Sequence, residues 1–358
     1  MTIESKIKQL AKILVEHSVK VKPGELVQIK FEGFGKPLVD ELTKEISLKG
    51  AYYLVTMNIS NRVKMAPMSN LEREVPGSRE IANKIDCLIS IDDDEDLYEL
   101  KNVKAERLNA VSKANHDVHE YIINNKKWCI VRYPTVSYAQ QAGMSFEEYS
   151  DYAFKTMITD WKKVKDKLAL LKNKLDKTNI VRIVGKETDI SFSVKNRKSI
   201  VAAGEYNMPD GELFTAPVAD STTGELFIPI AFHDSEKFEN LKLYFEKGRV
   251  VNFSVKGKKK KLEKLLSVDS NAKRLGELGI GINKGIKEIV GDILFDEKKN
   301  HTVHLALGSA YHECFNEDLK KMKKNDVSEL TNSSSLHWDL IISPEKVFFD
   351  NKEQKIWE

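Results

Sequence analysis

The sequence predicts a two-domain α/β protein, with a parallel sheet in the amino-terminal domain and a β-rich α/β fold in the carboxyl-terminal domain. Its 358 residues are enough for two domains of ordinary size, each burying its own core. In the first half, short apolar runs alternate with amphipathic helical ones, whereas short strand-like runs predominate in the second half. We therefore place the domains at residues 1–179 and 180–358.

The first domain begins with an amphipathic helix over residues 1–19, in which apolar residues recur at helical spacing between lysines. A second helix is predicted at residues 37–49, and Ser145 with Glu148 has the spacing of a capping box that opens a third. Short runs of apolar and β-branched residues predict strands at 26–31, 50–56, 87–91 and 128–133. Strands that alternate with helices in this way indicate a parallel sheet.

The two domains are joined by a lysine-rich helix predicted over residues 154–177, a stretch without proline or glycine. Beyond it, the second domain has strand-like runs at 180–184, 190–194, 227–230 and 249–255, and a helix near 262–266. Four consecutive lysines lie within residues 256–261, but no aromatic residues are interleaved with them. We interpret this run as a solvated loop and not as a nucleic-acid patch.

Composition excludes several classes of function. The 57 basic residues face 54 acidic ones, and a net charge of +3 gives no general attraction to nucleic acid. Cys87, Cys129 and Cys314 are far apart, so neither a disulfide framework nor a cysteine zinc site is indicated. The first helix lacks the unbroken apolar core of a signal peptide, and no run approaches the roughly 20 apolar residues that cross a bilayer. We expect a soluble cytoplasmic protein without membrane or nucleic-acid partners.

A block of acids at residues 92–96 follows the strand predicted at 87–91. Such acids bind Ca²⁺ or Mg²⁺ in some proteins, but this block lacks the regular spacing and the glycine of a calcium loop. We interpret it as a solvated turn.

The second domain carries acids and imidazoles suited to a pair of divalent metal ions. Carboxylates and neutral imidazoles are ligands for Zn²⁺, Co²⁺ or Mn²⁺, and an excess of carboxylates balances two close cations. In an extended chain, residues two apart leave the same face, so His337 and Asp339 can converge while Trp338 packs behind them. The candidate ligands are Glu212, Glu277, Glu297, His304, His337 and Asp339.

Each of these residues also has a simpler interpretation. Glu212 follows a segment rich in turn residues, so by local pattern alone it belongs to a hairpin and points into solvent. A single histidine in an apolar strand, as His304 is, usually forms hydrogen bonds within a core. The glycines around Glu277 do not match the GxGxxG fingerprint of a dinucleotide site. Only their joint occurrence in one domain indicates a metal site.

Through these residues the chain resembles the aminopeptidase T and aminopeptidase S family of two-metal aminopeptidases over nearly its full length. In the second domain the shared motifs are NMPDGE ending at Glu212 with FTAP after it, LGE ending at Glu277, HLALGSAY from His304 to Tyr311, and SLHWD ending at Asp339. In the first domain, RYPT at residues 132–135 and AGMS at 142–145 are equally typical.

The resemblance implies a fold, a site and an activity. It places the metal ligands at Glu212, Glu277, His304, His337 and Asp339, with Glu297 as a further acidic ligand. Tyr311 falls on the active-site tyrosine of the family. Two divalent ions (Zn, Co or Mn) would activate a water that hydrolyses the first peptide bond of short peptides with a free amino terminus. Glu277 would bridge the ions or act as the base, and the chain would form a homodimer with an enclosed site.

Two other kinds of function remain open on sequence alone. The same ligands could serve a hydrolase of another amide or ester bond, including a phosphoester, although no glycine-rich phosphate cradle or arginine cluster accompanies them. The polar residues could also belong to a non-catalytic protein that binds one structural ion. The leading hypothesis is a cytoplasmic metal-dependent aminopeptidase.

Overall fold

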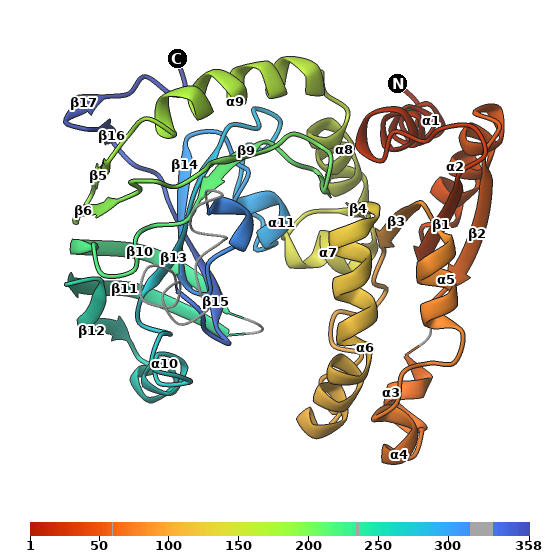
Figure 1. Ribbon diagram of the computed structural model, residues 1–358, viewed down its shortest axis with the longest axis horizontal. Helices are drawn as coiled ribbons and strands as arrows, with labels where there is room; N and C mark the ends of the chain where they lie inside the picture. Colours follow the sequence, from red (N-terminus) through yellow and green to blue (C-terminus); the bar gives the residue numbers. More distant parts are fainter. Residues whose placement is uncertain (59, 234–235, 316–331) are drawn as a thin grey trace. The chain divides into compact units, whose positions relative to one another are not determined.

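The computed structural model describes residues 1–58, 60–233, 236–315 and 332–358. These residues form two compact units, which we describe separately (Figure 1). The first comprises Met1–Trp161 and Gly204–Asp210, and the second comprises Lys162–Ala203 and Gly211–Glu358. The division of the chain into domains at residue 179 stays a prediction.

A parallel five-stranded sheet forms the centre of the first unit, as the sequence predicts (Figure 1). Its strands lie in the order β2-β1-β3-β4-β8. Four of them match the predicted runs closely, and the short β8 adds a pair of residues from beyond residue 200. The strands are β1 (Leu26–Phe31), β2 (Tyr52–Met57), β3 (Cys87–Asp92), β4 (Lys127–Arg132) and β8 (Asn207–Met208).

Helices cover this sheet with their apolar sides. Ala82 of α5 and Ile122 of α6 pack with Leu26 and Leu88 of the sheet, whereas α2 contacts β1 and β2. The helical segments of the first unit are α1 (Ile3–Ile13), the π-helical η1 (Leu14–Ser18), α2 (Lys36–Leu48), α3 (Asn61–Met65), α4 (Met68–Leu71), α5 (Ser78–Lys84), α6 (Ala105–Asn125), α7 (Val136–Gln141) and α8 (Phe146–Met157).

The predicted helix over residues 154–177 is wrong as a single element. Helix α8 ends at Met157, and α9 (Trp161–Leu175) begins after a break of three residues. The break starts at Ile158, whose φ of −89° and ψ of 81° are not helical. Neither proline nor glycine marks this break, so composition alone does not reveal it. The predicted capping box at the start of α8 is confirmed, because Ser145 and Glu148 exchange hydrogen bonds.

The interpretation of residues 92–96 as a solvated turn is wrong for Asp93, which is fully buried. Its carboxylate accepts the backbone N–H groups of Glu32, Gly33 and Gly35 at 2.7, 2.9 and 2.5 Å. These donors belong to the loop that follows β1, where the ladder of the sheet no longer satisfies them. Asp93 therefore fixes the loop after β1 from the end of the neighbouring strand β3.

We expect Asp93→Ala to lower the free energy of unfolding by about 3 kcal/mol, because three backbone donors lose their acceptor. Chemical denaturation followed by circular dichroism measures this loss. The matched control is Glu95→Ala, since Glu95 is exposed in the same acidic run, and it is expected to change stability by no more than about 0.5 kcal/mol. Equal stability of the two variants would contradict the structural role of Asp93.

The second unit contains two antiparallel sheets, which confirms that this half is richer in β-structure. The larger sheet has the order β12-β11-β10-β6-β5-β16-β17. Its strands are β5 (Ile180–Gly185), β6 (Thr188–Ser193), β10 (Thr223–His233), β11 (Glu236–Glu246), β12 (Arg249–Lys256), β16 (Lys346–Phe349) and β17 (Lys352–Glu353).

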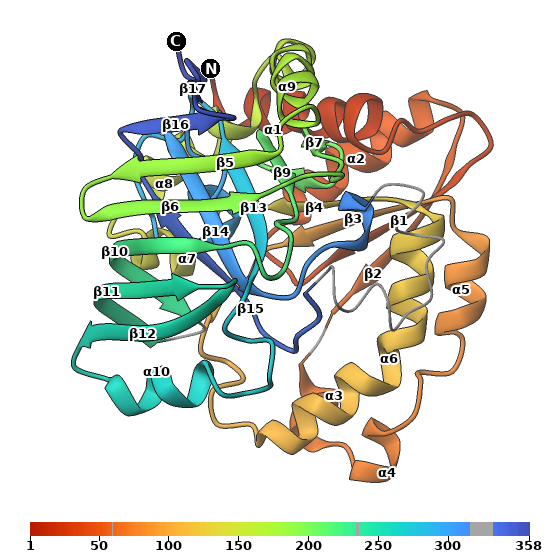
Figure 2. The same cartoon turned by 60° about the vertical axis from the view of Figure 1, so that its left-hand side comes forward.

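The smaller sheet has the order β15-β14-β13-β9-β7. In Figure 2 the strands of the larger sheet cross those of the smaller one. Trp338 joins the two layers, since its ring contacts Phe238 and its Nε1 donates to the carbonyl of Phe232 at 2.6 Å. The strands are β7 (Ile200–Ala202), β9 (Glu212–Thr215), β13 (Leu275–Gly281), β14 (Thr302–Gly308) and β15 (His337–Ile342).

Short helices complete the second unit. They are α10 (Lys259–Leu265), α11 (Ile293–Asp296) and the 3₁₀ segment η2 (His312–Cys314). The lysine run at residues 256–261 is solvated as expected, but it is not wholly a loop because α10 begins at Lys259. Across the part of the chain that the structure describes, no helix has the length and apolar character that a membrane span requires.

Candidate metal centre

The register of the smaller sheet brings the candidate ligands to one face. Antiparallel pairing sets Glu212 opposite Gly281, His304 opposite Gly279, and Asp339 opposite Ala306. Paired residues share a face of the sheet, and side chains two residues apart along a strand do as well. Four adjacent strands thus contribute to one group: Glu212 from β9, Glu277 from β13, His304 from β14, and His337 with Asp339 from β15.

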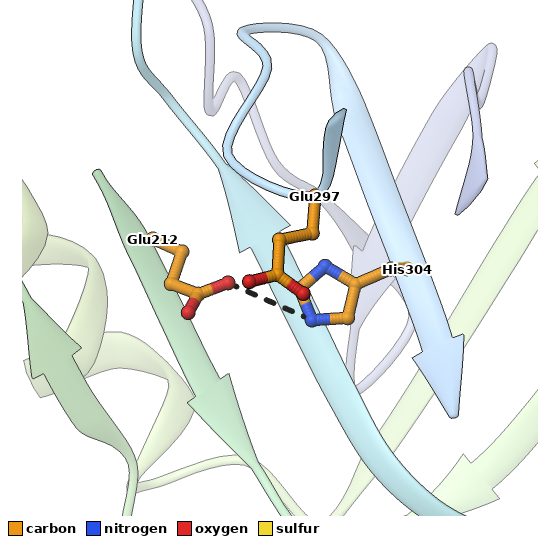
Figure 3. Close-up of side chains that lie close together, drawn as sticks. All are labelled: Glu212, Glu297 and His304. Carbon is orange, nitrogen blue, oxygen red and sulfur yellow. Dashed lines mark ion pairs between the residues drawn. The ribbon is translucent and has the colours of Figure 1, made fainter. Parts of the chain in front are cut away.

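The side chains form two overlapping sets, and within each set the ligand atoms lie within 4.8 Å of one another. The first set is Glu212, Glu297 and His304, shown in Figure 3. The second set is Glu277, His304 and Asp339. His304 belongs to both sets and is buried, with its Nε2 3.6 Å from Glu212 Oε2 and 3.4 Å from Glu277 Oε1. The interpretation of Glu212 as a solvent-exposed hairpin residue is wrong, because it is 6% exposed.

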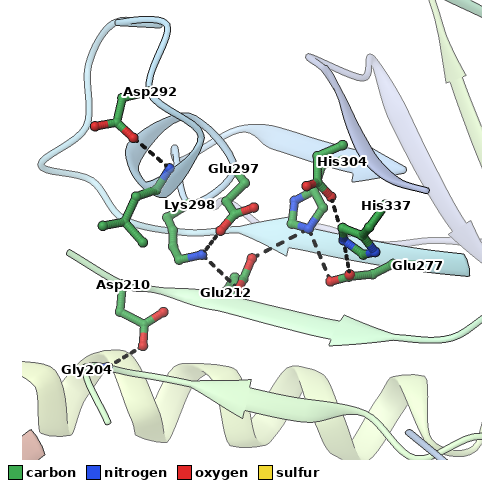
Figure 4. A network of polar contacts seen from close by, with 11 residues as sticks. Gly204, Asp210, Glu212, Glu277, Asp292, Glu297, Lys298, His304 and His337 are labelled. Atoms are coloured by element: carbon green, nitrogen blue, oxygen red, sulfur yellow. Dashed lines mark hydrogen bonds and ion pairs between the residues drawn. The ribbon is translucent and has the colours of Figure 1, made fainter. Parts of the chain in front are cut away.

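Glu277 lies between the two histidines. Its Oε1 is 3.4 Å from His304 Nε2, and its Oε2 is 3.4 Å from His337 Nε2 (Figure 4). His337 also lies 3.5 Å from Asp339 Oδ1, and its Nδ1 hydrogen-bonds the carbonyl of Ser309 at 3.0 Å. A carbonyl at Nδ1 places the proton there and leaves Nε2 as the free ligand atom.

Glu297 reaches the group from a helix end and not from a strand. It caps the carboxyl end of α11, and the next residue, Lys298, is fully buried. Lys298 Nζ hydrogen-bonds Glu297 Oε1, and it donates to Glu212 Oε1 at 3.0 Å (Figure 4). Sequence reasoning missed Lys298, because the run of charges around it is typical of a solvated surface. The structure thus brings all six candidate ligands together and adds an ammonium group beside them.

Two glycines of β13 make room for the group. A Cβ at Gly279 would lie 1.9 Å from His304 Cε1 and 2.0 Å from its Nε2, so the imidazole occupies the space of the missing side chain. A Cβ at Gly281 would lie 2.4 Å from the carbonyl oxygen of Lys299, in the loop that carries Glu297. These glycines, which fit no nucleotide fingerprint, therefore serve close packing over the strand.

Tyr311 lies beside His337 at the edge of the group. Its ring centroid lies 5.2 Å from that of His337 and 5.5 Å from that of Phe214, and the residue is 46% exposed. Partial burial and the negative charges of Glu277 and Asp339 raise the pKa of the Tyr311 phenol. The phenol therefore keeps its proton at neutral pH and can donate a hydrogen bond.

The electrostatics of the group show what it lacks without a cation. Burial raises the pKa of Glu212 to about 8. Burial lowers the pKa of His304, but the hydrogen bond to Glu277 and nearby carboxylates outweigh it and raise the pKa to about 10. The pKa of His337 is likewise raised to about 11, against burial, chiefly by Asp339 and Glu277. Glu212, His304 and His337 therefore hold their protons tightly, because burial and the neighbouring carboxylates disfavour further negative charge in the group.

The donor set fits divalent metal ions. Four carboxylates and two imidazoles lie close together, and Lys298 contacts two of the carboxylates. Two buried oxygens, Glu212 Oε2 and Asp339 Oδ1, accept no hydrogen bond from the described residues. Burying carboxylate oxygens without donors is costly, and a coordinated cation removes this cost. Oxygen and imidazole ligands suit Zn²⁺, Co²⁺ and Mn²⁺.

Comparisons with known proteins agree with this chemistry. The sequence model of a family described as thermophilic metalloprotease (M29) matches residues 3–357. Aminopeptidase AmpS of Bacillus subtilis is 26% identical over 397 aligned positions, which cover 98% of this chain and 95% of that protein. Aminopeptidase 2 of Geobacillus stearothermophilus is 24% identical, with coverages of 95% and 92%. Wild-type AmpT from Thermus thermophilus has the same fold, with a TM-score of 0.81 at 20% identity and coverages of 97% and 94%.

Proposed function

The chain belongs to the thermophilic metalloprotease family M29 and is a metal-dependent aminopeptidase, and we propose that it releases the first residue of short peptides at a site holding two divalent ions. One observation carries this proposal: four adjacent strands direct two imidazoles and three carboxylates to one buried point, where Glu297 joins them. The family model that matches residues 3–357 confirms the family resemblance read from the sequence motifs.

We propose that the two overlapping sets of side chains hold one ion each. Glu212, Glu297 and His304 form one set, and Glu277, His304 and Asp339 form the other, with His337 beside Glu277 and Asp339. When bound, such ions lower the pKa of a coordinated water and polarise the carbonyl of the scissile bond. The ligand types suit Zn²⁺, Co²⁺ or Mn²⁺, and the choice among them depends on supply as well as affinity.

Glu277 and Tyr311 are the proposed catalytic residues. One carboxylate oxygen of Glu277 faces each histidine, and this placement supports a role between the two ions or as the acceptor of a proton from water. The protonated phenol of Tyr311 is placed beside His337 and would donate a hydrogen bond to the oxygen that becomes negative during attack. The carboxylates around the site would favour a substrate with a positive α-amino group.

We further propose that the protein works in the cytoplasm as a homodimer. Three free, buried cysteines are compatible with a reducing compartment. Strand β2 supports self-association, because it lies at a sheet edge and exposes Tyr52, Tyr53 and Met57. Analytical ultracentrifugation over a range of concentrations measures the oligomeric state.

The proposed activity is tested with aminoacyl anilides beside their Nα-acetylated forms and a phosphoester. We expect turnover of the free-amine anilide only, loss of turnover after chelation, and recovery with Co²⁺, Zn²⁺ or Mn²⁺. Turnover of the acetylated substrate at the same rate would favour a general amide or ester hydrolase instead. If chelation changes the melting temperature alone and no substrate is cleaved, the ion is structural.

Metal binding is expected to release about three protons per chain at pH 7. In the metal-free protein the raised pKa values keep His304, His337 and Glu212 protonated, whereas a metal needs neutral imidazoles and an ionised carboxylate. The affinity for metal therefore rises with pH. Isothermal titration calorimetry in buffers of different ionisation enthalpy counts the protons, and metal binding without proton release at pH 7 would contradict the prediction.

The same pKa shifts set the stability of the metal-free fold. Its folded histidines have pKa values of about 10 and about 11, above the unfolded value of 6.5, so they bind more protons than the unfolded chain does. Their contribution is fully present below pH 6.5 and is lost as pH rises through 10 to 11. The chelated protein should therefore lose stability toward alkaline pH more steeply than the metal-loaded protein.

A further inference from the structure

Lys298 forms hydrogen bonds with one carboxylate oxygen of each of two candidate ligands, Glu212 and Glu297. Glu212 Oε1 accepts a hydrogen bond from Lys298 Nζ at 3.0 Å, while Glu212 Oε2 lies 3.6 Å from His304 Nε2. Glu297 Oε1 also accepts a hydrogen bond from Lys298 Nζ. In Figures 3 and 4 the two carboxylates turn toward each other across the space that borders His304. Each carboxylate is thus held by one oxygen and free to bind with the other.

We propose that Lys298 is a positioning residue that restricts Glu212 and Glu297 to one metal-binding oxygen each. A carboxylate without such a partner can bind a cation through both oxygens, which raises the coordination number of the ion. An ammonium fixed on one oxygen prevents this and keeps positions on the ion free for water and substrate. This inference rests on the proposed metal site and adds what shapes it.

The burial of Lys298 supports this role. Its side chain is 0% exposed, and a lysine is almost never fully buried unless it is paired. The side chains of Glu212 and Glu297 are 7% and 16% exposed, so water screens these pairs little. The carbonyl of Lys298 also accepts the backbone N–H of Asn283 at 2.9 Å, which ties its chain position to the end of β13. The ammonium is therefore fixed at both its backbone and its head.

The positive charge of Lys298 distinguishes a role in positioning the ligands from a role in attracting the metal ion. A positive group beside a cation site opposes metal binding, because like charges repel at short distance in a buried region. Lys298 thus does not serve to attract the metal. Its removal is expected to leave metal bound while altering how Glu212 and Glu297 coordinate it.

The test is Lys298→Met in the full-length protein loaded with Co²⁺, compared with wild type, Lys298→Arg and the control Lys299→Met. Methionine is unbranched and one atom shorter than lysine, and it removes the charge; Lys299 is the adjacent, partly exposed lysine. The readouts are cobalt content, the visible absorption spectrum of bound Co²⁺, which reports coordination number, and kcat with an aminoacyl anilide.

We expect Lys298→Met to keep its cobalt, to show the weaker absorption of more highly coordinated Co²⁺, and to lose about 10- to 100-fold in kcat. Lys298→Arg should restore part of both signals, since it keeps a donor on the carboxylates, and Lys299→Met should match wild type. An unchanged spectrum and kcat in Lys298→Met overturn the inference, as does loss of cobalt from a folded variant. A wild-type protein that binds no cobalt overturns both this inference and the proposed function.

Discussion

Glu277→Gln is expected to lower kcat/KM for an aminoacyl anilide by at least about 10³-fold while the fold is retained. The side chain of Glu277 is 5% exposed, and one oxygen of its carboxylate lies 3.4 Å from each histidine, so its negative charge acts on both imidazoles at once. Glutamine keeps its shape and removes only that charge. Steady-state kinetics, with circular dichroism as the check on folding, measures the effect.

The metal content of the same variant separates the two roles of Glu277. Two ions retained with activity lost would identify the base, whereas loss of one ion would identify a bridging ligand. The matched control is Glu345→Gln, an exposed glutamate in the same unit, which should keep full activity. Glu277→Gln with activity within about twofold of wild type would remove Glu277 from the catalytic site.

Gly279→Ala is expected to abolish metal binding at the His304 positions and to reduce activity to background, although alanine adds a single methyl group. That methyl group would lie within 2.0 Å of the His304 ring, so the imidazole has to leave its place between Glu212 and Glu277. Overpacking of this kind usually costs about 1–3 kcal/mol in stability, so the chain should still fold. Elemental analysis of the purified variant measures the loss.

The control for this substitution is Gly185→Ala, at the end of strand β5. A Cβ at Gly185 would make ordinary contact, with Pro344 Cα at 3.6 Å as its nearest neighbour. We expect this variant to bind metal and turn over substrate as wild type does. A Gly279→Ala variant with wild-type metal content would show that the His304 ring is not held at this place.

Local pattern predicted four of the five strands of the first sheet, and β5, β6, β10 and β12 of the larger sheet in the second unit, because each signal lies within a few residues. The alternation that puts His337 and Asp339 on one face, with Trp338 behind, is a property of any extended chain. The break between α8 and α9 was not predictable in this way, because residues 158–160 carry no proline or glycine. The chain passes from one compact unit to the other directly after this break.

The meeting of the candidate ligands depends on strand register, which local pattern does not contain. A slip of one residue between β13 and β14 would turn His304 away from Glu277, and a bulge between Leu275 and Glu277 shifts that register. Lys298 and Asp93 were missed for a related reason. Each lies in a run of charges typical of surface turns, and only the fold shows that each is buried against specific partners.

Diffraction data collected at the cobalt absorption edge from crystals of the Co²⁺-loaded protein test the proposed centre most directly. We expect two anomalous peaks about 3.5–4 Å apart, with His304 and Glu277 next to both or between them, and with Lys298 Nζ outside the coordination shell. A single peak, a peak at another place in the chain, or no peak in protein that hydrolyses aminoacyl anilides would contradict a dinuclear site on these strands.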